Sequence, residues 1–524
     1  MVWVILDPGF EQVIAVILGL AGVLSAGLAN PERSKGASKK WDPGQKADSK
    51  NGTSPVPKSV AVLPLKNLSP DPEDEFFSDG MTEDVIAQLS KIRALKVISR
   101  TSSMVYKDKA IGLREIAIQL GVEHVVEGSV RRDGNRLRVV AQLIDASTDQ
   151  HLWSETFDRQ VTDVFLIQSE IAKRIAGALE TRLSVGERQR IDAVPTESLE
   201  AYNLCLLGRH FWSRWTEEDL VRSTELFAQA VERDPAYARA HYEFGVAWAT
   251  LGLGYWSYRP LDVFPKAAGS INRALELDPG LADAHAWRGV ITLWFGFDWP
   301  AAEECFTRAI GLDPNSAHAH DSYGCWLTSV GRHEEAEIEY VRAKELDPLS
   351  LLLACNAALG AYRAGNQDRS VQLFDEAISL DPNLPMGHSL SSLAHLENGS
   401  PGVALREAEL GDRLSRGSTP YLVLHANALA ACGQGGEALS ILEEVEGRRE
   451  KENVWLVGLA IAYVSLGAHD LAFERLEQAV RERVGWVHWL PIEPSLDGIR
   501  EDPRFNELLT TVAPWAGVSP SRPT

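Results

Sequence analysis

An Ala-x-x-x-Asp-Pro motif recurs through the carboxy-terminal three-fifths of this 524-residue chain and constrains its fold more than any other feature. Its prolines, Pro235, Pro279, Pro314, Pro348 and Pro382, are 44, 35, 34 and 34 residues apart. Proline stops a helix because it lacks the backbone N–H that continuation requires. A period near 34 residues accommodates two helices and a turn. The spacing therefore predicts a stack of helix pairs in place of a single globular core.

Small and large side chains accompany this motif in the way that close helix packing requires. Each first helix is expected to carry a small residue, and each second helix a large apolar residue three positions before the alanine of the motif. These residues are Gly245, Gly289, Gly324 and Ala358, and Phe227, Ile271, Phe306, Tyr340 and Phe374. In period and pattern the segment resembles tetratricopeptide repeats. We expect about eight units over residues 197–485, a cap over 486–515 and a disordered tail over 516–524.

The resemblance implies an all-α, right-handed superhelix whose concave wall forms a groove for a peptide or partner helix. First helices line that wall. Their repeat positions give the groove candidates Arg239, Tyr242, Asp283, Trp287, Trp294, Asp321, Asn356, Tyr362 and Arg363. The alternative is that many of these are surface or packing residues without a ligand. The lysine and asparagine pattern with which some such repeats hold a terminal carboxylate is not evident.

Residues 59–190 predict a small α/β domain. Short apolar runs at 59–65 and 96–99 are expected to be buried strands, and a hairpin is expected around Asp133-Gly134-Asn135. A third strand is expected near 151–157. Apolar residues at helical spacing predict helices between the strands, one of which ends at Gly121, and a closing helix from Val164 to Leu179.

The strings SVAVLPLKNLSPDPEDEFFSDGMTEDVIAQLSKI and REIAIQLGVEHVVEGSVRRDGNRLRVVAQLIDASTDQHLWSETFDR in this domain resemble the TolB amino-terminal-like module. Bacteria place that module ahead of tetratricopeptide repeats. In similar chains the pair follows a winged-helix DNA-binding domain, as in CadC-like regulators, or a class III adenylate cyclase domain. This chain has only twelve residues ahead of its first apolar segment. We therefore expect neither output domain and carry over neither activity.

The amino-terminal residues predict a membrane anchor. Residues 13–29, after a short tail at 1–12, are an uncharged 17-residue run that suits a transmembrane helix or signal anchor. A cleaved signal peptide and a buried soluble helix are the alternatives. Residues 30–58 hold seven basic and three acidic side chains and predict a disordered linker. This basic flank favours a cytoplasmic location for the later domains. The families that the chain resembles place these domains in the periplasm. We expect the periplasmic location for this single-pass inner-membrane protein.

Composition and motifs exclude several functions. The 52 basic and 73 acidic residues give a net charge of −21, which argues against a nucleic-acid partner. Five cysteines without a C-x-x-C pair favour neither a disulfide scaffold nor a zinc ribbon. Nucleotide-binding, nucleophile-elbow and zincin motifs are absent, since His333-Glu334-Glu335 is followed by Glu337 where a zincin needs histidine. We expect no metal, no cofactor and no catalytic residue.

These features predict a membrane-anchored scaffold or sensory module that binds a protein or peptide in its groove. One alternative is a truncated or split signalling protein related to adenylate cyclase or to winged-helix regulators. Coding sequence for such a domain directly before Met1 would favour that alternative. The other alternative is an enzyme with an unrecognised site.

Overall fold

The computed structural model describes residues 58–71, 74–253, 258–449 and 453–515. The predicted segments 1–12 and 13–29, the linker up to residue 57 and the tail at 516–524 lie outside the described residues. Within the described ranges no helix is both long enough and apolar enough to cross a membrane.

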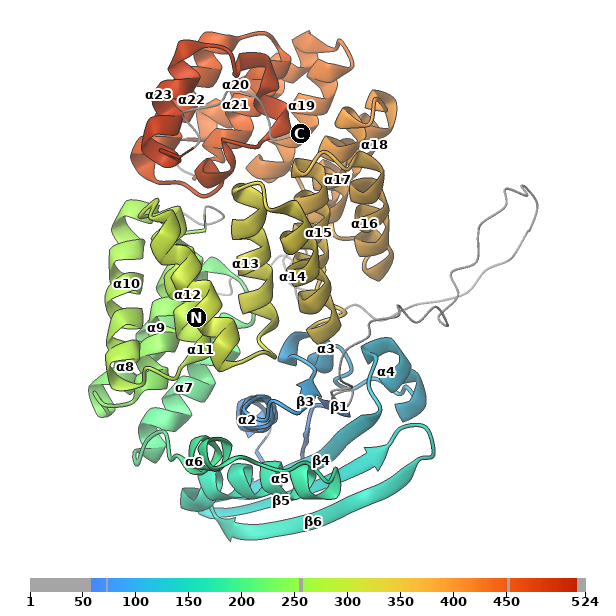
Figure 1. Cartoon of the computed structure of the whole chain (residues 1–524), viewed down its shortest axis with the longest axis vertical. Coiled ribbons are helices and arrows are strands. Elements are labelled where there is room, and N and C mark those ends of the chain that lie inside the picture. Colours follow the sequence, from blue (N-terminus) through green and yellow to red (C-terminus); the bar gives the residue numbers. More distant parts are fainter. Residues whose placement is uncertain (1–57, 72–73, 254–257, 450–452, 516–524) are drawn as a thin grey trace, which may run out of the picture.

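The amino-terminal domain is built on a mixed sheet with the strand order β3-β1-β4-β5-β6 (Figure 1). Its strands are β1 (Lys58–Val62), β2 (Lys66–Asn67), β3 (Leu95–Val97), β4 (His124–Asp133), β5 (Arg136–Asp145) and β6 (Gln150–Gln160). β1 runs parallel to β3 and β4, and β2 also pairs with β4 in parallel. β4, β5 and β6 form an antiparallel meander. The hairpin around Gly134 is thereby confirmed, and the sheet is mixed because helical crossovers lead into its parallel strands.

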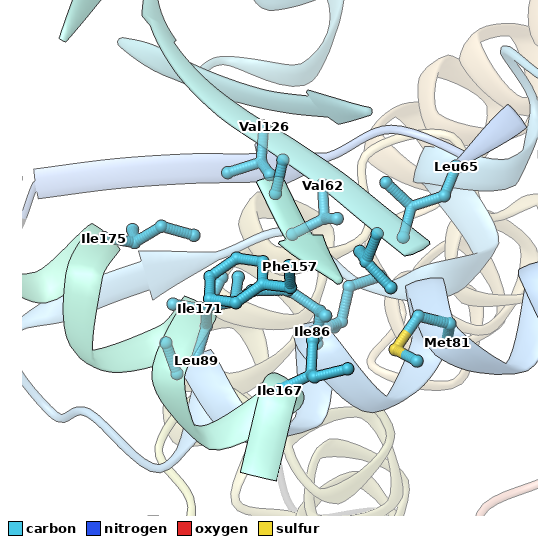
Figure 2. Close-up of a cluster of buried hydrophobic side chains, with 14 of the residues drawn as sticks. Val62, Leu65, Met81, Ile86, Leu89, Val126, Phe157, Ile167, Ile171 and Ile175 are labelled. Carbon is cyan, nitrogen blue, oxygen red and sulfur yellow. The ribbon is translucent and has the colours of Figure 1, made fainter. Parts of the chain in front are cut away.

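Helices cover both faces of the sheet near β1. On one face α2 (Glu75–Ser90) and α5 (Val164–Ala178) bury the main core of the domain, whose inward side chains Figure 2 shows. On the other face α3 (Arg100–Met104) and α4 (Leu113–Leu120) cover a smaller cluster around Ile98. Gly121 ends α4 with a φ of 61°, as the sequence predicts. The sequence did not predict α3 or the short α6 (Val185–Asp192).

Sixteen helices, α7 to α22, follow as eight packed pairs within the described residues. They are α7 (Leu199–Trp212), α8 (Glu217–Arg233), α9 (Ala238–Leu251), α10 (Pro260–Leu277), α11 (Ala282–Trp294), α12 (Trp299–Leu312), α13 (Ala317–Ser329), α14 (His333–Leu346), α15 (Leu351–Arg363), α16 (Gln367–Leu380), α17 (Pro385–Glu397), α18 (Pro401–Ser415), α19 (Thr419–Ala431), α20 (Gly435–Arg448), α21 (Leu456–Ser465) and α22 (His469–Glu482). Two 3₁₀ helices, η3 (Val487–Trp489) and η4 (Pro494–Ile499), and α23 (Pro503–Val512) complete the fold. The chain is thus a small mixed-sheet domain followed by a helical-repeat superhelix (Figure 1).

Glycines let the two helices of a pair approach closely. A Cβ atom on Gly289 would lie 2.6 Å from the Phe306 ring, and one on Gly245 would lie 2.5 Å from Ile271. These distances are shorter than real Cβ contacts, so the large residue of each second helix fits only over a bare backbone. The alternation of small and large residues in the sequence therefore has a steric cause.

The Asp-Pro turns between pairs are closed by polar side chains. Asp234, Asp278, Asp313 and Asp381 each accept a hydrogen bond from the backbone N–H two residues later, at 2.8–3.0 Å. Histidines in the next helix add a contact to the proline carbonyl, as His320 Nε2 does to Pro314 at 3.2 Å. His320 thus helps to close the turn, and its Nδ1 contacts Glu339 on α14.

Replacing Gly289 by alanine is expected to destabilise the chain by about 1–3 kcal/mol, because the new methyl group must displace the buried Phe306 ring. The matched control is Gly269→Ala on α10, where the added Cβ meets no atom within 4 Å. That change should raise stability by about 0.5–1 kcal/mol, since alanine favours helix. Thermal unfolding of both variants checks this. Shifts of the melting temperature in the same direction would contradict the steric explanation.

Candidate functional site

Arg209 on α7 lies at the junction between the mixed-sheet domain and the array. Its Nη1 is 3.0 Å from Glu83 and 3.1 Å from Asp84, both on α2, and its Nε is 3.4 Å from Glu243 on α9. The Arg209 side chain is only 9% exposed. Burial alone would raise the pKa of Glu83, but Arg209 and the arginines near it hold that pKa at about 2. The junction is therefore a buried network in which the Arg209 guanidinium faces three carboxyl groups, and Glu83 is ionised in it.

Arg239, a predicted groove residue on α9, belongs to this network. Its Nε is 2.7 Å from Glu243, and its Nη2 is 3.2 Å from Glu83 of the mixed-sheet domain. The guanidinium charge is therefore neutralised within the chain. Arg239 marks the place where the concave wall meets the amino-terminal domain.

The mixed-sheet domain also contacts the turns farther along the array. Asn315 Nδ2 donates a hydrogen bond of 3.0 Å to the Leu95 carbonyl, and the Ser99 N–H donates one of 2.9 Å to the Leu346 carbonyl. Asp347 departs from the other turn aspartates, because its carboxylate accepts from the backbone N–H and the hydroxyl of Ser102. The domain is thus attached to the repeats along the edge that their turns form.

The carboxy-terminal cap occupies the other end of the concave wall. Arg363 Nε is 3.1 Å from Glu493, and the Tyr362 hydroxyl is 2.8 Å from the same carboxylate. The two charged side chains are 2% and 1% exposed. The Arg363 guanidinium also lies over the rings of Trp489, at 3.9 Å, and Trp486, at 4.8 Å. Tyr362 and Arg363 therefore hold the cap of this chain.

Trp294 is engaged by the cap as well. Its ring stacks on that of His488, with centroids 5.3 Å apart and an angle of 19° between the planes. Burial, followed by the charge of Arg363, lowers the pKa of His488 well below its usual value. The stacked ring is consequently neutral, and the contact is an apolar one.

Between the occupied ends lie the remaining groove candidates, on α9, α11, α13 and α15. Asp283 is exposed and accepts a hydrogen bond of 3.1 Å from the Ser316 hydroxyl. Asp321 is 5% exposed and accepts one of 2.9 Å from Asn356 Nδ2. Trp287 packs on the ring of His318 with centroids 5.0 Å apart. Tyr242 is half-buried on α9. We call these five predicted residues, Tyr242, Asp283, Trp287, Asp321 and Asn356, the central wall.

The central wall has acidic groups without paired cations. Among the described residues, no lysine, arginine or histidine forms an ion pair with Asp283 or Asp321, and Asp321 Oδ1 has no hydrogen-bond partner. Burial raises the pKa of Asp321 to about 7. Burial also lowers the pKa of His318, so that ring is neutral at pH 7. The central wall thus has an acidic and aromatic character.

The structure divides the predicted groove residues into two groups. Arg239, Trp294, Tyr362 and Arg363 contact the mixed-sheet domain or the cap, while the other five form the central wall. Sequence reasoning missed the residues that occupy the ends, namely Glu83, Arg209, Trp486, His488 and Glu493. The aromatic run around Trp486 and Trp489 could have indicated that the cap packs on something apolar. No local signal marks Glu83 as the partner of Arg239.

The described part of the chain holds no set of side chains that could bind a metal ion. No group of three His, Cys, Asp or Glu side chains there is arranged to hold a metal ion. Burial raises the pKa of the Cys205, Cys325 and Cys355 thiols, which makes them poor nucleophiles. The central wall itself carries carboxylate, amide and aromatic groups.

Comparison with known families gives a match for the mixed-sheet domain. Residues 57–174 match the model of the HilA/YgeH-like transcriptional regulator, second domain. The resemblance to a TolB amino-terminal-like module stays a prediction, because the matched family is a different one.

Curated relatives match shorter parts of the chain. A "putative adenylate cyclase 3" of Rhizobium meliloti (strain 1021) is 37% identical over 240 residues, which are 46% of this chain and 41% of that protein. The type IV pilus assembly protein PilF of Pseudomonas aeruginosa is 28% identical over 141 residues, which are 26% of this chain and 54% of PilF. The chain thus spans about half the length, or less, of these relatives.

Some solved structures with helical repeats resemble the array, at low sequence identity and low TM-score. PilW, a type IV pilus biogenesis factor, is 16% identical with a TM-score of 0.35, over 42% of this chain and 96% of PilW. Yeast Tom70 is 15% identical with a TM-score of 0.39, over 84% of this chain and 95% of that chain. The helix pairs of this structure themselves establish its repeat fold.

Asp321→Asn is expected to stabilise the chain more at pH 8 than at pH 4.5. The folded carboxyl has a pKa of about 7 against 3.8 for an unperturbed aspartate, so between these values the unfolded chain has lost a proton that the folded chain keeps. Stability therefore falls as pH rises through this window, by up to about 4 kcal/mol, and asparagine removes that loss. Denaturant unfolding at both pH values measures it. Equal effects at both, or a pH-dependent gain also in the exposed Glu443→Gln control, would contradict the assignment.

Glu493→Gln is expected to cost about 3 kcal/mol of stability, because it leaves the Arg363 charge buried without a counter-charge. Arg363→Met combined with Glu493→Gln should cost less than the sum of the two single changes. The control is Glu376→Gln, which breaks the exposed pair with Lys344 and should cost about 0–1 kcal/mol. Chemical denaturation of the four variants tests whether the cap is held by this pair, and equal costs for Glu493→Gln and Glu376→Gln would refute it.

Proposed function

We propose that this chain is a protein-interaction scaffold that binds a protein or peptide partner on its central wall and catalyses no reaction itself. The observation that carries the proposal is that α9, α11, α13 and α15 bring acidic, amide and aromatic side chains together in the central wall, with Asp283 and Asp321 in no ion pair of the described residues. A superhelix with such a surface supports recognition of another chain.

The placement of the scaffold is part of the proposal. Residues 13–29 would anchor it in the inner membrane in a single pass, with the mixed-sheet domain and the array on the periplasmic side. The relative PilF is named an assembly protein, which supports a role in bringing other proteins together. A reporter fused to the carboxyl end, active on only one side of the membrane, tests the orientation.

A second candidate function is a part of a signalling protein related to adenylate cyclase. The match at 37% identity to a putative adenylate cyclase favours it. In that case the mixed-sheet domain and the array would regulate an output domain encoded next to this chain or supplied by another protein. This candidate would be supported if a cyclase is recovered together with the purified full chain and if the chain changes the catalytic rate of that cyclase.

Site-specific crosslinking of the full chain in the cells that produce it tests the scaffold proposal. A photo-reactive amino acid at Trp287, on the central wall, is expected to give a discrete crosslinked partner. The matched control is the same amino acid at Ile338, which is 66% exposed on α14. A band of added mass from position 287 that is at least about tenfold stronger than from 338 is the expected result. Equal labelling from both positions, or none from 287, would overturn the proposal.

A further inference from the structure

Strand β6 forms one edge of the sheet in the mixed-sheet domain. It comes last in the strand order, and among the described residues β5 is the only strand that pairs with it. Only Phe157 of its eleven residues is buried. Figure 1 shows β6 along the lower border of the molecule. A long edge of this kind carries backbone groups that can pair with a further strand.

The backbone groups at this edge belong to the even-numbered residues of β6. The Val161 N–H donates a hydrogen bond of 3.0 Å to the Asn135 carbonyl, one position beyond the last residue pair of the β5–β6 ladder. Hydrogen-bonded and non-hydrogen-bonded pairs alternate along an antiparallel ladder. Within residues 154–160 the odd-numbered residues therefore bond to β5, and the even-numbered residues direct their N–H and C=O groups outward.

The side chains of residues 154–160 are complementary to a second copy of the same strand. Their sequence is SETFDRQ, with Phe157 at its centre. When two such strands run antiparallel with the Phe157 residues opposite each other, Glu155 of each copy lies opposite Arg159 of the other. Opposite charges at directly opposed positions stabilise a strand pair. The edge therefore attracts its own copy, although charged side chains on an edge strand commonly prevent pairing.

Both charged side chains are accessible to a second strand. The Glu155 side chain is 34% exposed and that of Arg159 is 48% exposed. Their contacts within the chain are to α5, where Arg174 Nε is 3.2 Å from Glu155 and Glu170 is 3.8 Å from Arg159. The irregularity in the β5–β6 register lies ahead of residues 154–160, and this stretch contains no proline. The edge is therefore regular where the complementary charges lie.

Other antiparallel registers lose this complementarity. Centring the pair on Glu155, Asp158 or Arg159 places that residue opposite the same charge on the second copy. Like charges at opposed positions destabilise a strand pair. Centring it on Thr156 places Glu155 opposite an aromatic residue in place of a cation. The charges of the strand thus favour the register centred on Phe157.

We propose that two copies of this chain associate by antiparallel pairing of their β6 strands, with Phe157 at the two-fold axis and the two sheets joined as one. Thr156 of each copy would exchange two backbone hydrogen bonds with Asp158 of the other. Ser154 would do the same with Gln160. Because a two-fold axis joins the same surface of both copies, the pairing closes as a dimer. The inference goes beyond the proposed scaffold function, since no residue of the array belongs to this interface.

Exchange of charges tests the interface in the full chain purified in detergent. Glu155→Arg places like charges opposite each other at both ion pairs, and so does Arg159→Glu. Each variant alone is expected to dimerise about tenfold more weakly than the unchanged chain in sedimentation velocity. An equimolar mixture of the two variants restores opposite charges at both positions, so it is expected to form mixed dimers about as tightly as the unchanged chain. Misfolding of either variant would not be repaired by mixing.

The matched control is Glu443→Arg, which reverses one exposed charge on α20 and should change dimerisation less than twofold. An unchanged chain that stays monomeric up to its solubility limit would overturn the proposal. Single variants that dimerise like the unchanged chain would place the interface elsewhere and overturn it as well. The same holds for a mixture that associates no better than the separate variants.

Discussion

The guanidinium of Arg209, buried among Glu83, Asp84 and Glu243, joins the two halves of this molecule. Taking ionised groups out of water is costly unless each charge has a close counter-charge. The network meets that condition only when α2 of the mixed-sheet domain lies against α7 and α9. It therefore fixes where the domain sits on the repeats (Figure 1), and it takes Arg239 out of the surface open to a ligand.

The cap imposes a second constraint at the far end of the wall. It covers aromatic side chains on the first helices α11 and α15, which belong to the third and fifth helix pairs. Trp486, His488 and Trp489 cover that surface, and Glu493 neutralises Arg363 within it. The central wall lies between the residues bound by the domain and those bound by the cap. Its acidic character follows from the pairing of the arginines at both ends.

Much of the fold could be predicted because its causes are local. Gly324 and Tyr340 belong to one helix pair, and their sizes are complementary because the ring of Tyr340 packs against the bare backbone of Gly324. α4 ends at Gly121 because this residue has a left-handed backbone conformation, which glycine adopts freely. By contrast, Asp347 has the same motif position as Asp313, yet it binds Ser102 of the other domain. Nothing near Asp347 in sequence distinguishes the two.

Sequence by itself determined the repeat architecture and the strands of the hairpin, and it predicted a set of groove residues, because periodicity and side-chain size act within about one 34-residue unit. Tertiary structure alone decided which of those residues are free. Arg209 and Asp84 are 125 positions apart, and Arg363 and Glu493 are 130 apart. Pairing over such separations depends on how whole domains pack, since a charge is neutralised by whatever lies within a few ångströms of it and not by its neighbours along the chain.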